Sequence, residues 1–197
     1  MSTDTEKAYW DERTSFYEVW SENPVIAADH LSYSLRNIEP CLPLHDGAVI
    51  VDLGVGIGRL AKPLAEAYPS VRFIGVDISE AMLIEARRGS PDNLELLVCD
   101  GRNLPIGIQV DGAYSMVTFQ HMPREAVAGY IEQLRRIIKA GGVFRFQFIE
   151  GEQDEFQSHH FTRADLEKMI GDDFEIERYQ TTSRYADWRW VSLRKSK

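Results

Sequence analysis

The sequence of 197 residues predicts an α/β fold, in which helices cover a mostly parallel sheet. Apolar runs of strand length alternate with stretches of helical periodicity between about residues 48 and 149, as expected for parallel strands joined by helices. A glycine-rich turn joins the first run to a helix, and three of the runs end in an acidic residue. Two more strand-like segments near the C-terminus are expected to complete the sheet.

Composition and charge limit the classes of function. Hydrophobic residues (44%) and charged residues (27%) fit a globular protein with its own core, so residues 1–197 are expected to form a single domain. The net charge of −9 argues against a nucleic-acid partner, although a local basic patch can exist on an acidic protein. Cys41 and Cys99 form neither the spacing of a metal site nor a disulfide framework. No signal peptide or apolar run of membrane length is evident, so a cytoplasmic protein without a membrane partner is expected.

Residues 1–46 come before the first strand and predict two helices. The first is rich in aromatic residues, with Tyr9, Trp10 and Tyr17 near helical spacing. The second is expected from about Pro24 to Ile38. The aromatic side chains either anchor these helices to the sheet or cover a ligand, and the residues themselves leave both alternatives open.

The first strand and the turn after it form the most informative stretch. The strand is expected over residues 48–51 and ends at Asp52, after which Gly54, Gly56 and Gly58 alternate before a helical pattern begins. A strand, a glycine-rich turn and a helix bring bare backbone and helix N–H groups close to a ligand. An ordinary tight turn between a strand and a helix is the alternative.

Two features of this turn argue against a nicotinamide dinucleotide. The fingerprint G-x-G-x-x-G requires its third glycine where this sequence has Arg59. In addition, the Asp52 carboxylate would repel a pyrophosphate and suits a cationic amine better. Pro63 fits the first turn of the helix that follows, which places the start of that helix close to Gly58.

The second and third predicted strands also end in acids. Residues 71–76 lead to Asp77, and residues 94–98 lead towards Asp100. Ser79 is expected to cap the helix between these strands. Because the carboxyl ends of parallel strands line the ligand crevice of an open α/β sheet, the three strand-end acids are expected to meet there.

The second half of the chain supplies further strands and helices. They are expected at residues 111–119 (strand), 124–139 (helix), 143–149 (strand), 162–170 (helix), 174–181 (strand) and 187–193 (strand). The last two strands are expected to pair antiparallel to each other. The segment over residues 150–160 is polar and is expected to be irregular.

Five stretches, taken in order, resemble the motifs of class I S-adenosylmethionine-dependent methyltransferases. They are VDLGVGIGR, FIGVDIS, LLVCDGRNLP, VDGAYSMVTFQHMP and LRRIIKAGGVFRFQF. The resemblance implies a three-layer α/β/α sandwich around a mostly parallel, seven-stranded Rossmann-like sheet with an antiparallel C-terminal strand. It also implies an N-terminal helical lid (residues 1–46) on a cofactor-binding core (residues 47–197). The implied cofactor is S-adenosylmethionine, which leaves as S-adenosylhomocysteine (SAH).

The resemblance gives residues near the strand ends roles at the cofactor. Asp52 faces the methionine amine, directly or through water, Asp77 takes the ribose hydroxyls, and Asp100 accepts from the adenine amino group. Ile78 and Met82 flank the adenine. The complete set implied to bind the cofactor is Asp52, Leu53, Gly54, Gly56, Gly58, Arg59, Asp77, Ile78, Met82, Asp100, Gly101, Arg102, Met116 and Val117.

The tail of the fourth strand, TFQHMP, narrows the kind of acceptor. It lacks the acid or Asn, Pro-Pro and aromatic residue of DNA enzymes that methylate amino groups, and it lacks the Pro-Cys nucleophile of cytosine-C5 enzymes. It is similar to the small-molecule branch, where histidine is frequent at this place. His121 is therefore the candidate catalytic residue. It serves as a general base or as a packing residue beneath the cofactor, and packing is the preferred alternative.

Acceptor contacts are expected from the lid and from the segment after the fifth strand. The candidates are Tyr9, Trp10 and Tyr17 in the lid, and Glu150, His159 and His160 in the later segment. Aromatic rings attract a sulfonium cation, and in the family the later segment often shapes the acceptor pocket. A solvated charged loop is the alternative for that segment. The paired histidines lack a third ligand at a usual spacing, so no metal is expected.

The function that these expectations favour is methyl transfer to a hydroxyl or amine of a small-molecule acceptor by in-line displacement. A non-catalytic S-adenosylmethionine-binding module is the main alternative, and an NAD-dependent oxidoreductase is disfavoured by Arg59. Methylation of RNA or protein is disfavoured by the acidic charge. The identity of the acceptor stays open, as does the choice between a monomer and a homodimer.

Overall fold

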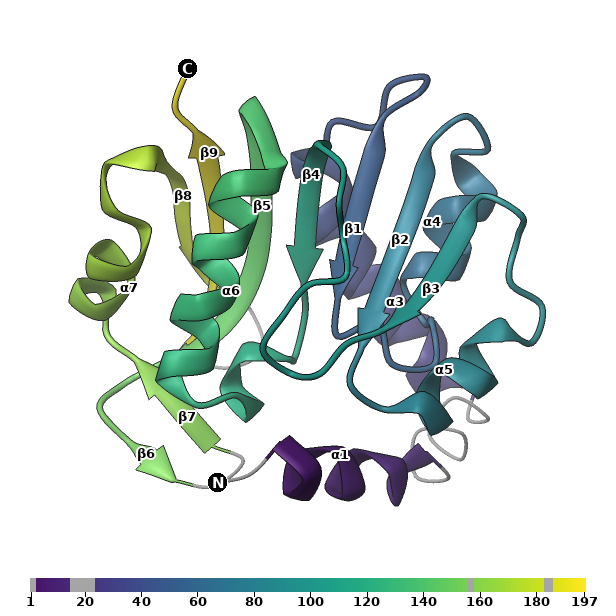
Figure 1. Cartoon of the computed structure of the whole chain (residues 1–197), viewed down its shortest axis with the longest axis horizontal. Helices are drawn as coiled ribbons and strands as arrows, with labels where there is room; N and C mark the ends of the chain where they lie inside the picture. The colour runs from purple at the N-terminus through teal and green to yellow at the C-terminus, as the bar shows by residue number, and fades with distance from the viewer. Residues whose placement is uncertain (1–2, 15–23, 156–157, 183–185) are drawn as a thin grey trace.

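The computed structural model describes residues 3–14, 24–155, 158–182 and 186–197. Within them the chain forms one sheet flanked by two layers of helices, which confirms the predicted fold class (Figure 1). The strands are β1 Val49–Leu53, β2 Arg72–Asp77, β3 Leu94–Val98, β4 Val110–Ser115, β5 Ile138–Glu150, β6 Asp154–Glu155, β7 Ser158–Phe161, β8 Phe174–Thr181 and β9 Trp188–Lys195.

The sheet runs in the order β3-β2-β1-β4-β5, and all neighbours in this series are parallel. β9 pairs antiparallel with β5, and β8 pairs antiparallel with β9, as the two closing segments predict. The central strand β1 places Asp52 between Gly75 of β2 and Tyr114 of β4. Because β1 to β4 run in the same direction, their carboxyl ends meet at one edge, at the bottom of Figure 1.

Two short strands correct the expectation for residues 150–160. β7 pairs in parallel with the end of β5, where Ile149 lies opposite His160, and β6 pairs antiparallel with β7. Alternation explains the strand, because His159 and Phe161 are buried while their neighbours are less so. The polar composition of this segment predicts a loop, but the segment forms a strand with two buried residues.

Helices cover both faces of the sheet. On one face lie α3 Pro24–Ile38, α4 Ala61–Ala67 and α5 Glu80–Arg87, and on the other lie α6 Arg124–Ile137 and α7 Arg163–Ile170. A further helix, α1 Thr3–Asp11, runs across the carboxyl ends of the strands (Figure 1). No helix of the described chain is long and apolar enough to cross a membrane.

The start of α4 agrees with the prediction. α4 begins at Ala61 with Pro63 in its first turn, and the Lys62 N–H donates to the Gly58 carbonyl at 3.0 Å. Gly56 and Gly58 have positive φ angles (54° and 81°), so the glycine-rich turn ends where the helical hydrogen bonds begin.

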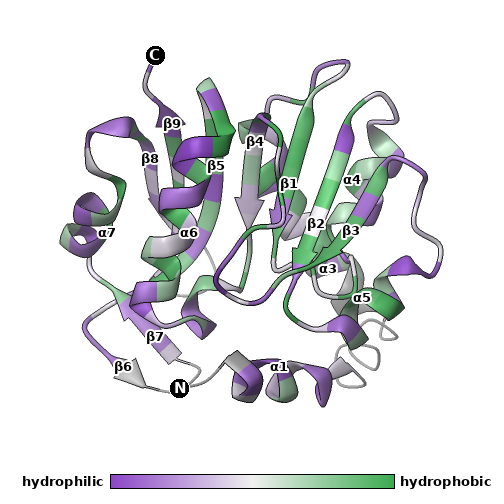
Figure 2. Cartoon of the chain, in the orientation of Figure 1, coloured by the Kyte–Doolittle hydropathy of each residue, from purple (hydrophilic) through white to green (hydrophobic). Residues whose placement is uncertain are grey.

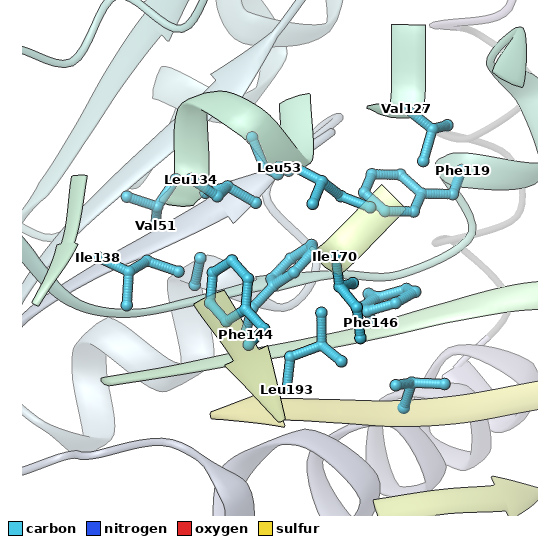
Figure 3. Close-up of a cluster of buried hydrophobic side chains, with 14 of the residues drawn as sticks. Val51, Leu53, Phe119, Val127, Leu134, Ile138, Phe144, Phe146, Ile170 and Leu193 are labelled. Carbon is cyan, nitrogen blue, oxygen red and sulfur yellow. The ribbon is translucent and has the colours of Figure 1, made fainter. Parts of the chain in front are cut away.

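The core between the sheet and α6 and α7 is apolar and rich in phenylalanine. Val51 and Leu53 of β1 contribute to the same cluster as Phe119 and the β5 residues Phe144 and Phe146 (Figure 3). Phe144 and Phe146 are at most 1% exposed, so replacing either by Ala is expected to cost roughly 3–5 kcal/mol of stability. Figure 2 shows the matching pattern, with hydrophobic residues along β1 and polar residues mixed onto the helices.

A buried polar contact fixes α3 to the opposite face. The Arg145 side chain of β5 is 1% exposed, and its Nε donates to the Asn37 carbonyl at 2.9 Å. Trp190 of β9 lies 5.0 Å from the guanidinium and donates its indole N–H to the Tyr33 hydroxyl at 3.1 Å. α3 is thus part of the sandwich, while α1 alone among the described N-terminal helices crosses the carboxyl edge.

Candidate active site

A cavity lies at the carboxyl edge of the sheet, between the strand ends and α1. It is lined by the turn after β1, the ends of β2 and β3, the start of α5, the segment after β4, and α1. Ten residues singled out from the sequence as cofactor contacts line it: Leu53, Gly54, Gly56, Arg59, Asp77, Ile78, Met82, Gly101, Met116 and Val117. His121 and Trp10 line it as well.

The glycine turn is shaped by two different requirements. Gly54 has a φ of 76°, and a Cβ at this position would come within 2.3 Å of the Thr118 hydroxyl oxygen. The turn is fixed to β2 because the Gly54 N–H donates to the Val76 carbonyl at 2.8 Å. Gly56 faces open space, since nothing lies within 4 Å of a Cβ placed there. Gly54 therefore packs the turn, and Gly56 leaves bare backbone at the cavity.

Asp77 connects three parts of this site. Its carboxylate accepts hydrogen bonds from the Gly56 N–H at 2.8 Å and from the Ser79 N–H at 2.9 Å. Burial raises the pKa of Asp77, although these backbone hydrogen bonds act to lower it. The acid at the end of β2 thus holds the glycine turn and the start of α5 around the cavity, with its carboxylate on the cavity wall.

Val117 carries backbone strain directly after β4. Its φ is 56°, in the left-handed region that β-branched residues rarely occupy. Thr118 supports the segment, because its hydroxyl donates to the Leu53 carbonyl at 3.2 Å. Such strain costs of the order of 1–3 kcal/mol and is concentrated at ligand sites. Here it brings the backbone of Met116 and Val117 to the cavity wall.

α1 closes one side of the cavity. The Trp10 ring meets the His121 ring at 5.0 Å in an edge-to-face arrangement. At the end of the helix, Asp11 accepts a hydrogen bond from the Ser79 hydroxyl at 2.6 Å and pairs with Lys7 at 2.6 Å. Burial acts to raise the pKa of Asp11, but the hydrogen bonds outweigh it and the pKa is lowered. α1 is therefore attached to both the β4 tail and the start of α5.

Comparison with known proteins agrees with this geometry. A family model described as a methyltransferase domain matches residues 50–142. A trans-aconitate 2-methyltransferase from Azoarcus sp. (strain BH72) is 33% identical over 120 residues, which cover 61% of this chain and 46% of that protein. A malonyl-[acyl-carrier protein] O-methyltransferase from Methylococcus capsulatus (strain ATCC 33009 / NCIMB 11132 / Bath) is 32% identical over 50% of this chain and 36% of its own length.

Residues 50–142 of this chain form a class I, S-adenosylmethionine-dependent methyltransferase domain. The chain also has the fold of solved methyltransferase structures. A Haloferax volcanii putative methyltransferase in complex with the Trm112 activator superposes with a TM-score of 0.76 at 18% identity, over 95% of this chain and 98% of that one. Magnesium protoporphyrin IX methyltransferase (ChlM) from Synechocystis PCC 6803, with bound SAH, superposes with a TM-score of 0.72 at 19% identity. The match covers 98% of this chain and 99% of that one. The chain spans about a third to a half of the length of the curated relatives it matches.

The structure places Asp52 beneath the cavity instead of on its wall. Asp52 is 4% exposed and is not among the lining residues. Burial raises its pKa to about 7, the neighbouring Tyr114 hydroxyl acts to lower it, and Asp77 acts to raise it. Direct contact with a ligand amine is therefore not supported, and contact through water stays a prediction.

Asp100 is not among the residues that line the cavity, and its expected role at the adenine stays a prediction. Its exposed carboxylate accepts from the Arg102 N–H at 2.9 Å and from the Asn103 N–H and side-chain amide at 2.6 and 2.8 Å. These hydrogen bonds lower the pKa of Asp100. An aspartate that starts a turn readily bonds its own backbone. Gly101 lines the cavity, whereas Asp100, Arg102 and Gly58 do not.

The three candidate residues after β5 are not among the residues that line the cavity. Glu150 accepts a hydrogen bond from the Tyr179 hydroxyl and pairs with Arg189 at 2.5 Å. His160 contacts the Ser158 hydroxyl at 3.2 Å, and His159 is 8% exposed within β7. Strand pairing and an ion pair engage this segment, and the acceptor contacts expected from Glu150, His159 and His160 stay a prediction.

The aromatic residues predicted for the lid differ in their position relative to the cavity. Trp10 lines the cavity, but Tyr9 packs against Trp10 at 5.0 Å and beneath the Arg13 guanidinium at 3.4 Å, without lining it. Tyr17 lies outside the described residues. A helix has one face towards the cavity, so adjacent residues cannot both point there.

Several lining residues escaped the sequence reasoning. They include Glu6, Cys99, Thr118, Met122 and Tyr130. Cys99 and Tyr130 contact each other at 3.4 Å between Sγ and the hydroxyl oxygen. Cys99 belongs to the third motif, so the sequence could have indicated that it lies at the site. Glu6 lies in a polar N-terminal stretch, where nothing in the sequence indicates a site residue. Among the described residues, no group of three or more His, Cys, Asp or Glu side chains is arranged to hold a metal ion.

Proposed function

We propose that this methyltransferase binds S-adenosylmethionine in the cavity beneath α1 and transfers its methyl group to a hydroxyl or amine of a small molecule. The observation that carries the proposal is the Asp77–Gly56 contact at 2.8 Å, because it combines an acid and bare backbone on one cavity wall. A nucleoside diol needs such an acceptor, and the open space beside Gly56 leaves room for a ligand to approach.

The described residues fit the parts of this cofactor. The Asp77 carboxylate, which also accepts from the Gly56 and Ser79 N–H groups, is the acceptor for the two ribose hydroxyls. Ile78 and Met82 supply apolar surface for the adenine, as expected for mostly apolar ligand pockets. Met116 and Val117 offer backbone groups to the methionyl portion. The bound cofactor supplies a methyl group that is already activated for displacement.

The chain mainly positions the reactants and excludes water. Correct alignment of two bound reactants can contribute an effective molarity of roughly 10⁵ M or more. Trp10 and His121 close the side of the cavity opposite the glycine turn, so we assign α1 the role of a lid. The Trp10–His121 ring contact supports the packing role for His121 over the role of general base.

The acceptor remains part of the proposal. The curated relatives are named for trans-aconitate, for malonyl-[acyl-carrier protein] and for C-methylation in ubiquinone/menaquinone biosynthesis, so oxygen and carbon acceptors occur among them. The Haloferax volcanii relative is in complex with an activator protein. We infer a monomer or homodimer that works in the cytoplasm on a small molecule without nucleic acid.

Two measurements test this function. Isothermal titration is expected to give SAH binding and no NAD binding, and replacing Asp77 by Ala is expected to abolish the SAH signal. Transfer of a radiolabelled methyl group to members of a metabolite panel is the second measurement. SAH binding without any turnover would favour a non-catalytic binding module, and NAD binding without SAH binding would contradict the proposal.

A further inference from the structure

Glu6 is an acid on the cavity wall. It has no role among the cofactor contacts proposed above. It lies on α1, is half-buried, and lines the cavity together with Trp10 one helical turn later. Residues four positions apart share a face of a helix. α1 therefore presents a carboxylate and an indole side by side to the space beneath it.

The other charged groups of the cavity lie on the opposite wall. Of the described lining residues, Asp77 and Arg59 also carry a formal charge, and both belong to the strand ends and the glycine turn. Asp77 is engaged with Gly56 and Ser79 and is assigned to the ribose. Arg59 is the only Lys or Arg in the described lining. Once the cofactor occupies that wall, Glu6 is the charge that faces the acceptor.

The surroundings of Glu6 act on the pKa of its carboxyl group in opposite directions. Burial raises the pKa of Glu6, while the charges of His159 on β7 and Arg102 after β3 act to lower it. Neither of these two residues lines the cavity. Within the described chain, no hydrogen bond or ion pair closes on the Glu6 carboxylate. It is thus available to a ligand on the cavity side.

The aromatic neighbour fits the same kind of ligand. Trp10 is fixed by its edge contact with His121 at 5.0 Å, so its position does not depend on an acceptor. Indole faces attract cations more strongly than other aromatic side chains do, and a carboxylate adds a charge-assisted hydrogen bond. A carboxylate acceptor would instead be repelled by Glu6, and a neutral hydroxyl would gain from neither group.

Resting on the proposed function, we propose that Glu6 and Trp10 form the acceptor subsite and select an amine that arrives as an ammonium ion. The subsite binds and orients the nitrogen between α1 and the His121 segment. The Glu6 carboxylate accepts one ammonium proton before transfer, and the freed nitrogen lone pair forms the N–C bond as the S–C bond of the cofactor breaks. Nitrogen is thereby chosen over oxygen among the acceptors that the proposed function allows. Glu6 is a specificity-determining residue in this scheme.

The test uses three probes that share a ring and differ in charge: benzylamine, benzyl alcohol and benzoate. Their binding to the SAH-saturated protein at pH 7.5 is measured by ligand-observed NMR titration. Benzylamine is expected to bind most tightly and benzoate most weakly. Glu6→Gln is expected to weaken benzylamine binding about tenfold and to leave benzyl alcohol binding unchanged.

Asp4→Asn is the matched control, because Asp4 is an exposed acid of the same helix that does not line the cavity. It changes the net charge equally and is expected to leave all three probes unaffected. SAH affinity is measured for both variants and is expected to stay at the wild-type value, which also reports that each is folded.

Two results would overturn the inference while leaving the proposed function intact. One is an SAH-loaded protein that binds benzylamine no better than benzyl alcohol, or not at all. The other is equal loss of benzylamine affinity in both variants, which would reflect net charge alone. Failure of the wild-type protein to bind SAH would overturn the proposed function, and this inference with it.

Discussion

The Asp11 carboxylate of α1 lies 2.6 Å from the Ser79 hydroxyl, which immediately precedes α5. The same hydroxyl oxygen accepts from the Met82 N–H at 3.1 Å and so caps α5. Since Ser79 also donates its own N–H to Asp77, one short segment connects α1, α5 and the acid at the cavity. The position of the lid is therefore coupled to the ligand wall.

Replacing Asp11 by Ala is expected to loosen α1 and to weaken SAH binding about fivefold, because a hydrogen bond to a charged group contributes roughly 1 kcal/mol or more. Hydrogen exchange is expected to show faster exchange in residues 3–11 and no change in β1. Lys7→Gln is the control, since its exposed ion pair with Asp11 contributes little. An equal effect of both substitutions would contradict a specific role for the Ser79 contact.

The two acids at the ends of β2 and β3 are expected to differ sharply on substitution. Asp77→Asn removes the charge and one acceptor that hold Gly56 and Ser79, so SAH affinity is expected to fall between tenfold and a hundredfold. Asp100→Asn is expected to change it less than threefold, because Asp100 bonds its own loop. Isothermal titration of both variants decides this, and a larger loss for Asp100→Asn would show that its carboxylate turns into the cavity on binding.

Asp52 is expected to make stability depend on pH. Its pKa is about 7 in the folded protein and near 3.8 when exposed, so the folded state holds the proton more tightly. The associated stability is fully present below pH 3.8 and is lost as pH rises to about 7. The loss amounts to roughly 4 kcal/mol. Asp52→Asn mimics the protonated acid and removes this dependence.

Urea unfolding at several pH values measures that effect. The Asp52→Asn variant is expected to be more stable than the wild type at pH 8, with a difference that shrinks towards pH 4. Taking the difference between the two proteins cancels the contributions of other titrating groups. A constant difference across this range would mean that Asp52 ionises normally in the folded protein.

The sequence predicts the sheet well because its signals are local. Alternating runs and the Ser79 cap lie within a few residues of the elements they define, and the structure confirms this cap. The orientation of a side chain is not local in this way. Asp77 ends β2 and Asp100 lies two residues beyond β3, but the N–H and side-chain amide of Asn103 bond the Asp100 carboxylate to its own loop.

The position of α1 likewise depends on contacts that are not local in the sequence. Glu6 lies at the cavity because α1 is attached there by contacts such as that of Asp11 with Ser79, which are 68 positions apart in the sequence. Nothing in the residues around Glu6 indicates that contact. Likewise, β7 pairs with the edge of β5, which no signal in β7 itself indicates. This pairing buries His159, although the composition of the segment predicts a solvated loop.

Val117 offers a test of whether backbone strain serves the site. Glycine tolerates the φ of 56°, so Val117→Gly is expected to relieve strain and raise stability by about 1 kcal/mol after the cost of a more flexible unfolded chain. SAH affinity is expected to fall, because the segment beside Met116 loses its fixed conformation. Val117→Ala keeps the strain while removing the branched side chain, so it is expected to retain most of the affinity. Thermal unfolding and isothermal titration report the two quantities, and a stabilised Val117→Gly variant with unchanged SAH affinity would show that the strain has no part in ligand binding.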